Sequence, residues 1–134
     1  MNKLDKRTGL VAAILGGITI AIGAFGAHGL KPLVDADAIA SFETGVRYQM
    51  YHVIVLLVVG IARPLGAGTK LWVLRFFCFG ILLFSGSIYL LALKEVLPFS
   101  VRFLGPITPF GGLLFILGWL RLGYGIFKLK SEQN

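Results

Sequence analysis

Four long apolar runs, separated by short polar stretches, constrain this chain more than any other feature of its sequence. They occupy residues 9–28, 46–62, 71–93 and 107–127. The hydrocarbon core of a bilayer is about 30 Å thick, so a spanning helix needs roughly 20 mostly apolar residues. Four such runs fill most of the 134 residues. The sequence therefore predicts one all-α transmembrane domain over residues 1–134, with four antiparallel spanning helices in a compact bundle.

The composition supports a membrane protein and explains its positive charge. Charged residues make up 14% of the chain, against about 25% in soluble domains, and the mean hydropathy is +0.86. The net charge of +7 would suggest nucleic acid as a partner of a soluble protein. Here the positive residues flank the apolar runs, so we predict no nucleic-acid partner. The single cysteine, Cys78, lies inside the third run and has no metal-binding motif around it.

The distribution of lysine and arginine predicts the orientation of the chain. If the N-terminus is inside, nine of these residues fall on the inner side and four on the outer side. Lysine and arginine near the ends of spans favour the cytoplasm. We therefore expect a multi-pass protein of the inner (cytoplasmic) membrane with both termini in the cytoplasm. The first run is longer than the apolar region of a signal peptide, so we expect it to be retained as a helix.

Small residues recur along the first and fourth runs. Gly9, Ala13 and Gly17 are spaced four apart in the first run, and glycines recur every seven residues in the fourth. Small residues on one face let a neighbouring backbone approach closely in lipid. The first and fourth helices are therefore the best candidates for tight packing at the centre of the bundle. The alternative is a seam between copies of the chain, and association with another membrane protein also stays open.

The segment before the second run allows two structures. Residues 36–47 follow Pro32 and a capping residue, Asp35, and have helical composition. They form either an extension of the second spanning helix or a short amphipathic helix on the outer surface. Glu43 and Arg47 are four residues apart and can pair in both arrangements.

Polar residues in the outer half of the membrane form the strongest candidate site. His52 lies about 15 Å from the end of the second run, well inside the membrane. Polar groups there usually face the protein interior. His28 ends the first run on the same side, so we expect both histidines in one cluster with Tyr48. The other predicted members are Glu43, Arg47, Gln49, Ser85 and Ser87.

Three interpretations of this cluster stay open. It could bind a small ligand, an ion, a proton or a lipid group. It could act only as a polar lock between helices, in a structural or accessory protein. His28 and His52 could also bind a metal or ligate haem, as imidazoles on separate helices can. The cofactor is therefore left unassigned.

Two arginines, Arg75 and Arg121, lie inside the inner halves of the third and fourth runs. No carboxylate of the inner half can pair with them except Asp5, which we place on the N-terminal tail. They either extend along the helix to the headgroups or bind the phosphates of anionic lipids. Membrane lipids, anionic ones above all, are thus the expected partners.

Catalysis has little support in this sequence. It contains no nucleophile elbow, no metalloprotease helix motif and no phosphate-binding loop. Only His28, His52 and Glu43 could do acid–base work, and no nucleophile is placed against them. Whether the protein is an enzyme stays open, and the sequence favours a role other than catalysis.

Four motifs resemble the YgdD-type family of small membrane proteins, a family of unknown function. They are GAFGAHGL at residues 23–30, RYQMYH at 47–52, FSGSIY at 84–89, and GPITPFGG at 105–112 followed by Gly118 and Trp119. The motifs occur in the family's order and cover nearly the whole chain. The resemblance implies a four-span protein of a bacterial inner membrane. It implies no activity, because none is assigned to the family.

Overall fold

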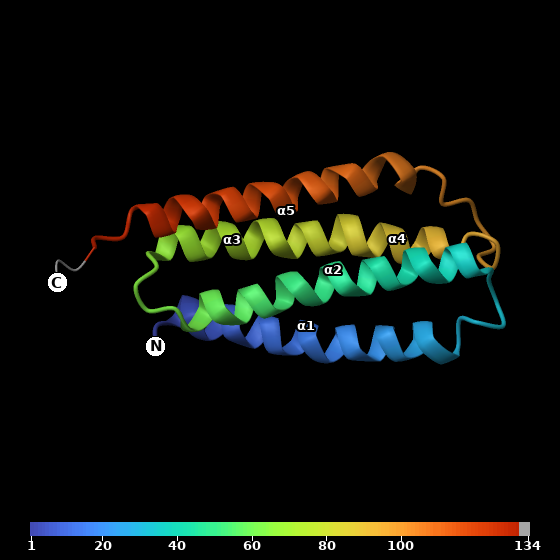
Figure 1. The fold of residues 1–134 in the computed structure, drawn as a ribbon, viewed down its shortest axis with the longest axis horizontal. Coiled ribbons are helices and arrows are strands. Elements are labelled where there is room, and N and C mark those ends of the chain that lie inside the picture. The colour runs from blue at the N-terminus through green and yellow to red at the C-terminus, as the bar shows by residue number, and fades with distance from the viewer. Residues whose placement is uncertain (132–134) are drawn as a thin grey trace.

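The computed structural model describes residues 1–131 as helices joined by short loops, with no strand among them. The helices are α1 (Lys3–His28), α2 (Ala36–Ile61), α3 (Ala67–Gly80), the π-helical turn η1 (Ile81–Ser85), α4 (Gly86–Ala92) and α5 (Leu104–Phe127). The segments α3, η1 and α4 form one continuous rod, so residues 1–131 contain four long antiparallel helices (Figure 1). Each is long and apolar enough to cross a membrane, which confirms the predicted fold class.

The first two helices begin at side-chain caps. The side chain of Asn2 accepts a hydrogen bond from the Asp5 backbone, and Asp35 accepts one from Ala38. Such caps satisfy backbone N–H groups that have no partner within the helix. The α1 helix therefore starts at Lys3, and the prediction that Asp5 lies on a tail is wrong. Residues 36–47 belong to the single rod of α2, so the surface-helix alternative is also wrong.

The fourth spanning helix starts three residues before its predicted boundary. It begins at Leu104, so Pro109 lies inside α5 and not in its first turn. Proline has no N–H, and the carbonyl of Gly105, four residues earlier, therefore lacks its usual helical donor. The missing backbone hydrogen bond lies near the start of α5, at one end of the protein.

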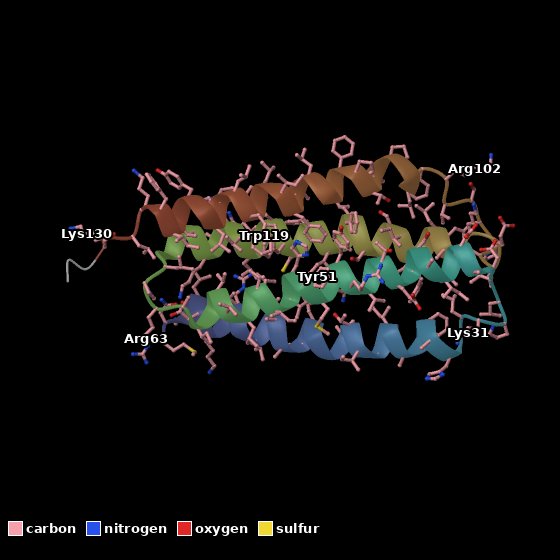
Figure 2. The ribbon with its side chains drawn as sticks, in the orientation of Figure 1. Lys31, Tyr51, Arg63, Arg102, Trp119 and Lys130 are labelled. Atoms are coloured by element: carbon pink, nitrogen blue, oxygen red, sulfur yellow. The ribbon has the colours of Figure 1, made fainter. Side chains whose placement is uncertain are left out.

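The two ends of the helices differ in what they carry. The start of α1, the end of α5 and the turn between α2 and α3 lie at one end, which we call the terminal end (Figure 1). The two longer connections, residues 29–35 and 93–103, lie at the opposite end, which we call the loop end. Arg63 and Lys130 mark the terminal end in Figure 2, and Lys31 and Arg102 mark the loop end.

The first and fourth spanning helices do not occupy the centre of the packing, where they were predicted to lie. The α1 helix packs mainly on α2, and α5 packs mainly on α3 and η1, with α2 and α3 between them (Figure 1). The first and fourth spanning helices, expected to pack at the centre, therefore lie on either side of the two central rods. A stripe of small residues indicates that another helix can approach closely, but it does not indicate which helix that is.

The glycine seam of α5 does mark a close helix contact. Gly111 faces the backbone of η1 at Phe84, and Gly118 faces Phe77. Gly125 faces Thr69 at the terminal end. A side chain at any of these three positions would overlap its neighbour, so α5 lies against the third rod along its whole length. On α1, by contrast, Gly17 faces open space.

Candidate functional site

His52 lies inside the protein, where both of its ring nitrogens have partners. It is 4% exposed. Its Nδ1 lies 2.6 Å from the carbonyl oxygen of Tyr48, and Trp119 donates its indole N–H to Nε2 across 3.1 Å. A carbonyl only accepts and an indole N–H only donates, so this pattern assigns the proton to Nδ1 of a neutral ring. The imidazole therefore has no free nitrogen.

Aromatic rings surround the same imidazole. It stacks on Phe115, with ring centroids 3.6 Å apart, and meets the edge of Phe77 at 4.7 Å. The ring thus joins α2 to both α3 and α5. Trp119 lies between the two ends of the protein, nearer the terminal end (Figure 2). This arrangement is a polar lock between helices, and a metal could reach His52 only by breaking it.

A second polar connection crosses three helices. Gln49 on α2 donates to Thr19 on α1 across 2.9 Å and accepts from the hydroxyl of Tyr89 on α4 across 2.7 Å. Ser85 on η1 donates to the backbone carbonyl of Gly45. Each of these buried polar groups is satisfied by another helix, which is how polar groups are accommodated in a membrane. From the sequence, Thr19, Tyr89 and Trp119 were not included in the polar cluster. Residues of these types in membrane helices commonly serve in helix packing or at the membrane interface.

The predicted histidine pair does not form. His28 is exposed at the last turn of α1. Gly16 faces Val53 and Gly23 faces Val46, so His28 lies level with a position about eleven residues from His52 along α2. That separation is roughly 17 Å of helical rise. The short loop does join α1 to α2, but His28 lies at the loop end whereas His52 lies further along α2. The two imidazoles are therefore not neighbours.

The other predicted members are dispersed over α2 and the third rod. Arg47 donates to Thr44, and no ion pair joins it to Glu43 in residues 1–131, so the predicted pairing is wrong. Both charged side chains are exposed. The ring of Tyr48 is 41% exposed and lies 5.0 Å from that of Phe84. Ser87 bonds back to the carbonyl of Leu83 in its own rod.

An ion pair at the terminal end was missed. Lys70 donates to Asp5 across 2.6 Å, and these residues are 2% and 9% exposed. Buried charges in proteins are normally paired in this way. A signal was present, because Asp5, Thr8, Ala12 and Thr19 share one face of α1 and all four are buried. The ion pair was missed because the first apolar run was taken to begin after the charges.

Both predicted lipid-phosphate arginines extend toward the terminal end. Arg121 donates to Thr69 across 2.8 Å and lies over the ring of Tyr124, with 5.5 Å from Cζ to the ring centroid. Arg75 lies over the ring of Trp72 at 5.1 Å. Each aromatic partner is three residues nearer the terminal end than its arginine. The guanidinium groups are therefore directed along the helices and out of the membrane centre.

A cavity of about 800 Å³ opens at the loop end between α2, α4 and α5. Its rim is polar and carries Asp35, Asp37, Lys94 and Glu95. Below the rim the lining is mainly apolar and includes Ala38, Ile88, Leu91 and Ala92. Ser41, Gly105, Thr108 and Pro109 also line it. The cavity lies at the same end as the predicted polar cluster, but it does not include either histidine.

Four apolar helices held together by internal polar contacts define a small multi-pass membrane protein. The chain belongs to the family described as a protein of unknown function (DUF423), whose model matches residues 22–112. A UPF0382 membrane protein of Staphylococcus saprophyticus is 42% identical over 90% of this chain and 96% of its own. The UPF0382 inner membrane protein YgdD of Escherichia coli K12 is 36% identical over 92% and 91%. No solved structure matches the chain.

Proposed function

We propose that this protein binds a small amphiphilic ligand in the cavity at the loop end. We place it in the inner membrane, with its terminal end in the cytoplasm and the cavity facing outward. Two E. coli relatives are called inner membrane proteins, and the lysines and arginines gather at the terminal end. The histidines are not part of this ligand site, because His52 has both nitrogens engaged and His28 lies on another helix.

The cavity is the observation that carries this proposal. Its volume falls within the 300–1,000 Å³ typical of small-molecule sites. It combines an apolar floor with a few polar groups, as such sites do. The contacts of His52 and Ser85 hold α2 against its neighbours, so the walls belong to rigid helices. A preformed hollow of this kind favours binding because little order is lost when a ligand enters.

Filling the cavity tests the proposal. Ala38 lines it, whereas Ala40 lies two residues away on the same helix, is exposed and is not part of the lining. We expect wild type and Ala40→Trp, purified from membranes, to retain the same small molecules, and Ala38→Trp to lose at least one. Untargeted mass spectrometry of the extracted proteins is the measurement. Identical extracts from all three proteins would favour a purely structural or accessory role.

A second site for lipid is supported by the arginines. Arg121 is held by Thr69 and points toward the terminal end, where its planar donors suit a lipid phosphate. Arg75 points the same way from the lipid-facing side of α3. Native mass spectrometry of Arg75→Ala, Arg121→Ala against wild type tests this role. Equal retention of anionic lipid by the two proteins would leave the arginines as topological anchors.

A further inference from the structure

We infer that the ligand of the loop-end cavity carries a primary ammonium group on a short apolar body. This inference rests on the proposed function and names the chemical class of the ligand. It is drawn from three properties of the cavity: the charge of its rim, the kind of polar group below the rim, and the depth of its apolar part.

The rim has an excess of negative charge. Three carboxylates, Asp35, Asp37 and Glu95, line it together with one cation, Lys94. Asp35 also caps α2 by accepting a hydrogen bond from the backbone of Ala38, which leaves its charge in place. No ion pair joins Lys94 to a carboxylate within residues 1–131. A cationic group is therefore attracted to this rim, and an anionic group is repelled.

The uncharged polar groups of the lining, which are Ser41, Gly105 and Thr108, can all accept hydrogen bonds. Gly105 lines the cavity, and its carbonyl lacks the helical donor that Pro109 cannot supply. Thr108 uses its hydroxyl to donate to Leu104, so that donor is already engaged. A primary ammonium has three N–H donors, which match carboxylate and carbonyl acceptors. A quaternary ammonium has the same charge but no donor, so it matches this lining less well.

The depth of the apolar part of the cavity sets the length of the ligand's apolar body. On α2, Ser41 lies four residues below Asp37, and on α4, Ile88 lies four residues below Ala92. Four helical residues rise about 6 Å. The walls between these levels are side chains of Ala38 and Leu91. A chain of about six carbons fits this depth, and a longer one would extend into the surrounding lipid.

A set of six-carbon probes tests the assignment. The full-length protein is placed in nanodiscs of neutral phosphatidylcholine, and binding of hexylamine, hexyltrimethylammonium, hexanol and hexanoate is measured by titration calorimetry against empty nanodiscs. We expect wild type to bind hexylamine most tightly, and Ala38→Trp to bind none of the probes. Asp37→Asn, Glu95→Gln should weaken hexylamine about three- to ten-fold and leave hexanol unchanged, because exposed ion pairs contribute modestly. Lys94→Gln should strengthen hexylamine.

A variant of the proline tests the acceptor separately. Pro109→Ala supplies an N–H to the carbonyl of Gly105, so it should weaken hexylamine and leave hexyltrimethylammonium unchanged. The possible failures are distinguishable. If all four probes bind equally well and only Ala38→Trp abolishes binding, the ammonium assignment is overturned and the cavity remains a binding site. If no probe distinguishes wild type from Ala38→Trp, the cavity does not bind these ligands and both the inference and the proposed function fail.

Discussion

Trp119 of α5 donates its indole N–H to Nε2 of His52 on α2, and these residues are 67 positions apart in the chain. The bond ties α5 to α2, although α5 otherwise packs mainly on the third rod. Trp119 itself is 47% exposed, so its indole N–H reaches inward from the surface of α5 to the buried imidazole. The histidine therefore organises the core of the protein and is not an open ligand.

Removal of this bond should destabilise the protein measurably. Hydrogen bonds between membrane helices contribute about 0.6 kcal/mol on average and up to about 1.7. We expect Trp119→Phe to lower the free energy of unfolding within that range, because Nε2 of His52 then has no donor. Denaturant unfolding in mild detergent is the measurement. Trp72→Phe is the matched control, since Trp72 is 45% exposed and contacts only Arg75 and Phe76 among the rings and cations described. An equal loss in both variants would contradict the role of the bond.

The buried ion pair predicts a contrast between single and double substitutions. Lys70→Met alone should lower the unfolding midpoint clearly, because it leaves the charge of Asp5 without its partner. Asp5→Leu, Lys70→Met should recover most of that loss, since an apolar pair of similar volume often replaces a buried ion pair without cost. Thermal unfolding of the purified variants measures both effects. Lys6→Met removes an exposed lysine from the same helix and should change the midpoint little.

The seam of α5 predicts strong position dependence for one substitution. A Cβ at Gly111 would overlap the backbone of Leu83 and Phe84, which cannot move aside as a flexible side chain can. We expect Gly111→Ala to destabilise by about 1–3 kcal/mol or more. At Gly123, on the same helix, nothing lies within 4 Å of such an atom. Gly123→Ala should therefore be neutral or slightly stabilising, and similar losses at both positions would show that α5 does not lie against η1.

The proposed orientation is tested by labelling from opposite sides of the membrane. In a Cys78→Ala background, cysteines are introduced singly at Ser100, at the loop end, and at Ser131, at the terminal end; both positions are exposed. The thiol reagent is one that passes the outer layers of the cell but cannot cross the inner membrane. Added to intact cells, it should label Ser100→Cys only. Ser131→Cys should react after the membrane is opened. Labelling of both positions in intact cells would mean that α5, the one helix between them, does not cross the membrane.

The fold was largely readable from the sequence because lipid imposes a simple rule. A backbone in hydrocarbon must satisfy its own hydrogen bonds, so long apolar runs become helices. The boundaries were less readable. Asp5, Lys70 and Gly105 fall outside the predicted spans, because charges and prolines were taken as ends of helices, whereas the real helices continue through them.

What the sequence by itself determined was the number of spans and the periodic faces that pack. The identity of the partners was decided only by the tertiary structure. Nothing in the spacing of His52 says that its ring meets Trp119, or that His28 lies roughly 17 Å away along the helices. Lipid makes every apolar face almost equally acceptable, so helix order depends on shape and on a few polar contacts. Those contacts join residues far apart in the chain, and they exist only once the helices are side by side.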